Sequence, residues 1–199
     1  MRQVAALFVR ADSVYKSMPG VDCYDIERDA RRWPGGVPGV FHPPCRAWGS
    51  LRHFAKPRPD EKDLARWAVR QVREWGGVLE HPAASTLWAD QSLPEPGQRD
   101  RWGGWTLVIY QGWFGHLADK ATRLYIVGCA PSEIPVMPIR LGDAPRVISP
   151  WRGLRAGMPG YRTQCTKAMR EHTPPLLAEW LIELARRTRV PAAREAMAA

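Results

Sequence analysis

Residues 37–80 constrain the fold more than any other stretch of the sequence. Val37 to Phe41 is a short apolar run that leads directly into a proline-rich loop, as a buried strand does. Residues 60–75 place apolar side chains on one helical face, and Gly76-Gly77 follows as a C-terminal stop. Val78-Leu79-Glu80 is the next expected strand. Strand, loop, helix and strand in this order predict a βαβ unit with a parallel sheet.

Other apolar runs extend this unit into a single α/β domain over residues 1–199, with a mostly parallel sheet and flanking helices. A last helix is expected from Thr173 as N-cap to about Arg189, with Pro174 in its first turn. Residues 130–160, rich in proline, glycine and arginine, predict an irregular basic insertion, and 191–199 predict a frayed tail. Further strands are expected at 4–9, 21–26, 105–110 and 123–127, and a short helical turn at 27–33.

The charge balance bears on partners rather than on fold. A formal net charge of +9 favours a polyanionic partner, nucleic acid first. Ten tryptophans support this interpretation, since indoles stack on bases. A solvated basic surface that only aids solubility is the alternative.

The start of the chain lacks the apolar stretch of a signal peptide, and no window approaches the roughly 18 apolar residues of a membrane span. We therefore expect a cytoplasmic protein with no membrane partner.

The loop after the strand at 37–41 carries the first candidate for chemistry. His42-Pro43-Pro44-Cys45 places a thiol behind two prolines, each of which fixes φ near −65°. A stiff loop suits a nucleophile, because attack requires the sulfur to be held close to an electrophilic carbon. His42 and Arg46 are candidates for stabilising the thiolate. Glu80 ends the neighbouring strand, so its carboxylate is expected at the same sheet edge as Cys45. A buried structural cysteine and a salt-bridged strand-end acid are the plainer alternatives.

Taken together, these motifs resemble the DNA cytosine-5 methyltransferases, in particular small phage-type members. That family has a Pro-Cys loop after one strand and a Glu-Asn-Val triplet on the next. The resemblance implies a Rossmann-like fold, here a truncated methyltransferase-like core, and a transferase that acts on cytosine C5 in DNA. Cys45 is then the nucleophile that adds to C6, and Glu80 is the acid that contacts the exocyclic amine and N3. His81 stands where the family has asparagine.

The same resemblance implies which residues contact the substrate. The segment from Tyr110 to Tyr125 is similar to the tyrosine-glycine and lysine-threonine region of these enzymes, where basic residues meet the target base and its phosphate. The residues carried over as substrate-binding are Pro44, Arg46, His81, Lys120, Thr122 and Arg123.

S-adenosylmethionine is the cofactor that the resemblance implies, with Phe8 and Asp25 as the candidate cofactor-binding residues. The sequence departs from the family here, because no glycine follows the first strand until Gly20. Glycine lets the backbone approach the cofactor closely. The group that is transferred is therefore left open.

Two other functions remain open from the sequence. One is a catalytically inactive methyltransferase-like protein that binds DNA or counters restriction, which the missing glycine turn favours. The other is a metal site formed by His42, Cys45, His81 and Cys23.

Overall fold

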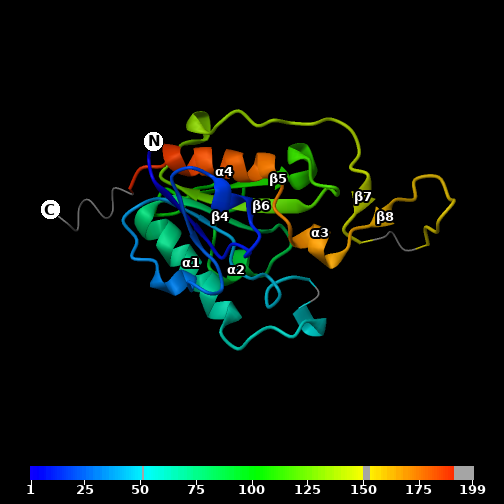
Figure 1. The fold of residues 1–199 in the computed structure, drawn as a ribbon, viewed down its shortest axis with the longest axis horizontal. Coiled ribbons are helices and arrows are strands. Elements are labelled where there is room, and N and C mark those ends of the chain that lie inside the picture. The colour runs from blue at the N-terminus through cyan, green and yellow to red at the C-terminus, as the bar shows by residue number, and fades with distance from the viewer. Residues whose placement is uncertain (51, 150–152, 191–199) are drawn as a thin grey trace.

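The computed structural model describes residues 1–50, 52–149 and 153–190. One six-stranded sheet forms the centre of the molecule (Figure 1). Its strands are β1 (Val4–Leu7), β2 (Val21–Tyr24), β3 (Gly39–Phe41), β4 (Gly77–Pro82), β5 (Trp105–Tyr110) and β6 (Ala121–Val127). Their spatial order is β2-β1-β3-β4-β6-β5. The first three pairings are parallel, and β6 is antiparallel to both β4 and β5. The protein is thus α/β with a mostly parallel sheet, as the sequence predicts.

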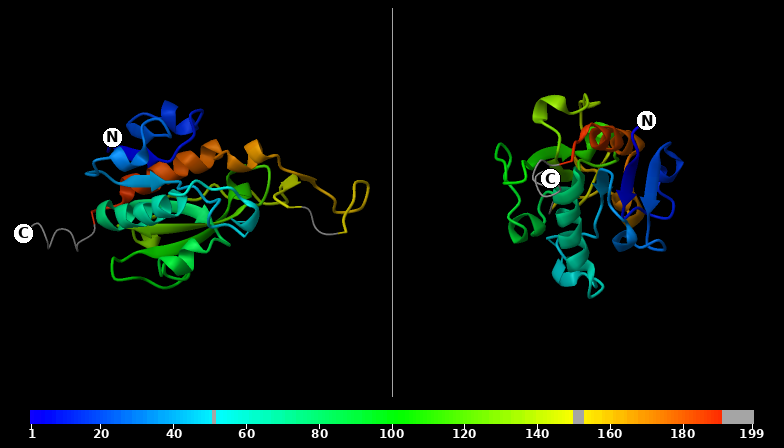
Figure 2. Two further views of the ribbon diagram at one scale, coloured as in Figure 1. Left: turned by 90° about the horizontal axis from the view of Figure 1, so that it is seen from below. Right: turned by 90° about the vertical axis from the view of Figure 1, so that its left-hand side faces the viewer.

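Two long helices cover the two faces of the sheet (Figure 2). α1 (Glu61–Trp75) packs with Leu79 of β4, whereas α4 (Pro175–Arg187) packs with Val78. Successive side chains of a strand point to opposite faces. An apolar strand that is buried on both faces therefore contributes side chains to two hydrophobic cores. The shorter elements are η1 (Val14–Ser17), η2 (Ala30–Arg32), η3 (Arg52–Phe54), α2 (Leu87–Asp90), η4 (Gln111–Phe114), η5 (Pro131–Glu133), β7 (Arg146–Val147), β8 (Thr163–Gln164) and α3 (Lys167–Glu171).

The glycine pair after α1 is required by close packing. Gly76 has φ +78°, and its amide donates to the Val72 carbonyl as the helix ends. Gly77 has φ +119°, and a Cβ there would lie 2.1 Å from the Gly39 carbonyl oxygen. A side chain at this position would therefore push β3 and β4 apart.

The structure corrects several predicted boundaries. β1 ends at Leu7 rather than Val9, because Phe8 takes a left-handed φ of +62°. The last helix begins at Pro175, and Thr173 does not cap it. Pro174 has ψ 140°, since the residue before a proline is driven away from the helical region.

The described part of residues 130–160, predicted as an irregular basic insertion, includes η5 and the strand β7. β7 pairs in parallel with β8, and this segment extends away from the main sheet beyond α3 (Figure 1). Arg152 and the predicted frayed tail at 191–199 lie outside the described residues. In the described part of the chain, no helix has the length and apolar character needed to cross a membrane.

Candidate active site

A pocket of about 960 Å³ opens at the carboxyl ends of β1, β3 and β4. From β1 the chain passes to β2 on one side and then returns to β3 on the other side of β1. Open α/β sheets bind ligands at such a reversal. Phe8, Cys45 and Glu80 line the pocket. The structure thus brings the two residues of the predicted chemistry to one site.

The Cys45 thiol is placed by a tight turn behind Pro43 and Pro44. The Cys45 carbonyl accepts from the amides of Trp48 and Gly49, at 3.0 and 2.9 Å. Cys45 is exposed at the pocket, but desolvation by the pocket walls raises its pKa. The Lys120 ammonium opposes this effect, and the Glu80 carboxylate adds to it. Lys120 is the cation that lowers the pKa of the thiol most, and Arg46 also interacts with the thiolate charge.

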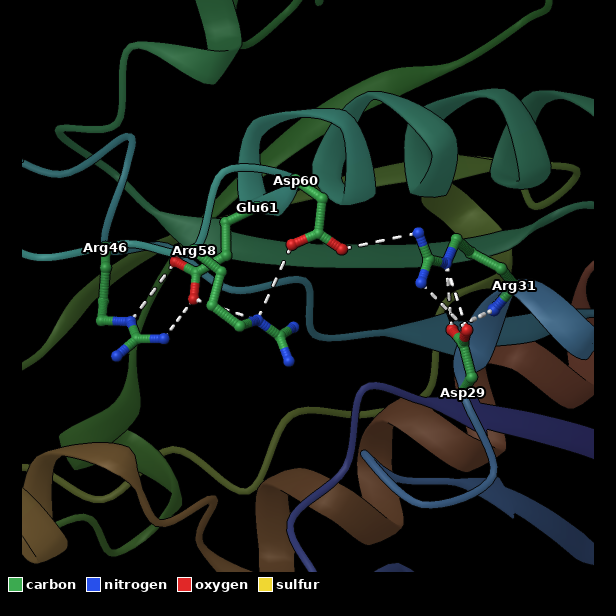
Figure 3. A network of polar contacts seen from close by, with 6 residues as sticks. All are labelled: Asp29, Arg31, Arg46, Arg58, Asp60 and Glu61. Carbon is green, nitrogen blue, oxygen red and sulfur yellow. Dashed lines mark hydrogen bonds and ion pairs between the residues drawn. The ribbon is translucent and has the colours of Figure 1, made fainter.

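The Arg46 side chain is held by an acid of α1. Its guanidinium pairs with Glu61, whose side chain is fully buried, and Arg58 contacts the same carboxylate at 3.8 Å (Figure 3). Arg58 also contacts Asp60, which in turn contacts Arg31 (Figure 3). Arg46 also lines the pocket, so its contact with substrate stays a prediction, and its guanidinium anchors the Cys45 loop to α1.

Glu80 is held by hydrogen bonds to both of its oxygens. His42 Nδ1 lies 3.0 Å from Oε2, and Gln111 Nε2 donates to Oε1 at 3.0 Å. The same Gln111 nitrogen lies 3.1 Å from the Thr122 hydroxyl. Burial alone would raise the pKa of Glu80, but Lys120 and His42 outweigh it and lower this pKa to about 2. Glu80 is therefore a carboxylate in the structure at neutral pH.

A tyrosine completes this polar network. The Tyr15 hydroxyl lies 2.9 Å from His42 Nε2, and the Tyr15 residue is 1% exposed. Burial and the nearby Glu80 charge raise the pKa of Tyr15 well above its usual value. Sequence reasoning missed both Tyr15 and Gln111 as site residues. Neither lies in a recognisable spacing pattern, although Gln111 falls inside the segment that resembles the methyltransferases.

Several predicted substrate contacts lie elsewhere. His81 is fully buried on the opposite face of β4, where its ring contacts Trp88 at 6.4 Å between centroids. Arg123, which pairs with His81 across the sheet, bonds to Glu95. Thr122 is buried behind Gln111 and lies outside the pocket lining, as does Pro44. Strand alternation explains the positions of His81 and Arg123. Residues next to those on the pocket face of a strand point to the other face of the sheet.

The half of the pocket nearest β1 does not offer the groups that S-adenosylmethionine needs. Phe8, rather than glycine, occupies the turn after β1, and its ring packs against Trp67 at 5.9 Å between centroids. Asp25 lies outside the pocket lining. Its carboxylate accepts from the Lys16 ammonium at 2.6 Å and from the amides of Glu27 and Arg28. Its oxygens are therefore occupied by hydrogen bonds within the turn after β2. The residues on the β1 side of the pocket do not fit S-adenosylmethionine.

The metal hypothesis finds no support in the described residues, which contain no group of His, Cys, Asp and Glu side chains able to hold an ion. His42 and His81 lie on opposite faces of the sheet, because His42 bonds Glu80 while the side chain of His81 points to the α1 face.

Comparison of the chain with protein-family models, curated proteins and solved structures finds no match.

Proposed function

We propose that the protein is an enzyme that modifies a pyrimidine base in DNA, most simply cytosine at C5. The observation that carries the proposal is the meeting of Cys45 and Glu80 in one pocket, each on a rigid support. A structural cysteine would not need an exposed thiol beside Lys120. A structural acid would not need to face a pocket with free lone pairs on both oxygens.

The proposed chemistry is the activation of cytosine. The Cys45 thiolate forms a C–S bond at C6, the π pair of the C5–C6 bond forms a C4–C5 double bond, the π pair of the C4–N3 bond moves to N3, and N3 takes a proton from the protonated form of Glu80. The product is an enamine with a nucleophilic C5. Glu80 accepts from the exocyclic amine, because a carboxylate oxygen with one hydrogen bond retains a free lone pair. Glu80 must be protonated before it can donate to N3, and desolvation by a bound base raises its pKa in that direction.

The fold supports the same proposal in a more limited way. The strand order and the site at the chain reversal are compatible with a Rossmann-like, truncated methyltransferase-like core. Because the β1 side of the pocket does not fit S-adenosylmethionine, the proposal ends at C5 activation and names no transferred group.

DNA is the proposed partner because of the charge at the pocket rim. Arg52, Lys120, Lys167 and Arg170 contribute to the lining, and the chain carries a net charge of +9. Ile148, next to β7, also lines the pocket, so the basic segment extends from the pocket edge. A base in duplex DNA would have to be flipped out to reach Cys45.

The activation step can be measured without knowledge of the transferred group. In deuterium oxide, the enamine takes a deuteron at C5, loses the original proton and expels the thiolate, which leaves deuterium at C5. We expect the protein to catalyse this exchange in a cytosine-containing oligonucleotide, read by mass spectrometry. Cys45→Ser should reduce the rate by at least about 10³-fold and Glu80→Gln by about 10²-fold or more. Cys23→Ser, outside the pocket lining, is the matched control and should retain the rate.

The second candidate function is DNA binding without catalysis, favoured by the poor fit of the β1 side to the cofactor. It predicts that Cys45→Ala binds DNA as tightly as the wild type and that neither protein exchanges C5 deuterium. The enzyme proposal is contradicted if wild-type exchange equals that of Cys45→Ser.

A further inference from the structure

The hydrogen bonds around Glu80 continue to a residue that lies across the pocket, on the loop after β1. Tyr15 lies in η1, His42 follows β3 and Glu80 lies in β4, so the chain of contacts joins three separate segments. Each contact is close to ideal length, at 2.9 Å for Tyr15–His42 and 3.0 Å for His42–Glu80.

The direction of these bonds follows from the charge of Glu80. An ionised carboxylate only accepts hydrogen bonds, so His42 Nδ1 must carry a proton. In a neutral imidazole the other nitrogen, Nε2, is then an acceptor. The Tyr15 phenol must therefore donate to it, and this phenol is buried and keeps its proton. Glu80 and Tyr15 thus hold the His42 ring from its two nitrogens, and His42 in turn orients Glu80.

We propose that Tyr15 and His42 are positioning residues that hold Glu80 as an oriented carboxylate for the base, through a relay from Tyr15 to His42 to Glu80. This proposal rests on the function proposed above for Glu80. The other oxygen of Glu80 is held by Gln111, so the relay and Gln111 together fix the plane of the carboxylate. The relay also links the β1 side of the pocket to the catalytic side, because Tyr15 and Val14 line the pocket near Phe8.

The first readout is independent of activity. In two-bond ¹⁵N–¹H correlation spectra of the imidazole rings, we expect wild-type His42 to be the Nδ1–H tautomer. Tyr15→Phe removes one hydroxyl and leaves the ring in place, so His42 Nε2 should lose its hydrogen bond and its ¹⁵N signal should shift, while Glu80 keeps the proton on Nδ1. A wild-type Nε2–H tautomer, or an unchanged spectrum of His42 in Tyr15→Phe, would overturn the relay even if the enzyme is active.

The second readout is the pH profile of C5 deuterium exchange. His42→Ala should slow exchange about 10- to 100-fold and Tyr15→Phe about 2- to 10-fold, as expected for a charge-assisted and a neutral hydrogen bond. His42 lowers the pKa of Glu80, and Glu80 donates to N3 in its protonated form, so removal of His42 should move the limb on which the rate falls with rising pH to higher pH. A uniform loss of rate with no shift of the limb would indicate a merely structural role and would overturn the proposal.

Tyr125→Phe is the matched control. Tyr125 is also a buried phenol, but it bonds to Asp100 on the α1 face. This variant should lose stability and retain the pH profile. If no variant or wild-type protein exchanges deuterium, the proposed function fails, and the tautomer experiment still decides whether the relay exists.

Discussion

Arg46 and Glu61 form an ion pair that ties the loop of the candidate nucleophile to the first turn of α1 (Figure 3). The Glu61 side chain is fully buried, whereas half of the Arg46 side chain is exposed. A charge buried this deeply is tolerated because Arg46 and Arg58 both neutralise it. The ion pair thus joins the turn that carries Cys45 to α1.

Glu61→Gln should therefore destabilise the protein and loosen the turn around Cys45. We expect a loss of about 1–3 kcal/mol in the free energy of unfolding, measured by urea denaturation. Hydrogen–deuterium exchange at the Trp48 and Gly49 amides, which bond to the Cys45 carbonyl, should also accelerate. Asp63→Asn, on the exposed side of α1, should stay within about 0.5 kcal/mol of the wild type. Equal effects of the two variants would contradict the anchoring role of Glu61.

Lys120 and Glu80 should shift the reactivity of Cys45 in opposite directions. Lys120 lowers the pKa of the thiol and Glu80 raises it. Alkylation of the Cys45 peptide by iodoacetamide, followed by mass spectrometry across pH, reports this pKa because the thiolate is the reactive form. Lys120→Met should slow alkylation near neutral pH, and Glu80→Gln should accelerate it. Lys62→Met, near Trp48 on α1, serves as the control and should have no effect. Matching profiles for all of these proteins would argue against this electrostatic account.

His81 should make the protein less stable as the pH falls. Burial lowers its pKa from 6.5 to about 4, because the ring is desolvated more than Glu80 can compensate. Between these values the unfolded chain binds a proton that the folded protein excludes. Stability is therefore full above about pH 6.5 and declines toward pH 4, by up to about 3 kcal/mol. His81→Leu should flatten this decline in urea titrations, whereas His53→Leu, at an exposed position, should not. If the free energy of unfolding of His81→Leu declined with pH as steeply as that of the wild type, other groups would be the cause of the decline.

Local patterns in the sequence were enough to predict much of the fold. Residues 60–75 form α1 because the apolar spacing and the glycine pair act within one segment. The same holds for β3, which precedes the Cys45 loop, and for β4, which carries Glu80. α3 was missed because its five residues, Lys167–Glu171, are too few to show a helical period.

The site was predicted less completely, because its contacts join distant parts of the chain. Tyr15 and His42 are 27 residues apart, and Arg46 and Glu61 are 15 apart. No spacing pattern in a single sequence indicates such pairs. The position of His81 is different, since strand alternation already places Glu80 and His81 on opposite faces. Strand alternation is therefore a better guide to the position of His81 than the fact that His81 stands where the methyltransferases have asparagine.

The decisive measurement is the capture of the Cys45–base bond itself. An oligonucleotide carrying pyrimidin-2-one in place of one cytosine lacks the electron-donating amino group, so its C6 is attacked more readily and the adduct accumulates. After mixing, intact-mass spectrometry should show the protein plus one oligonucleotide, with the added mass on the Cys45 peptide. Cys23→Ser should form the same adduct and Cys45→Ser should form none. A wild-type protein that binds this oligonucleotide but yields no covalent complex would contradict the assignment of Cys45 as the nucleophile.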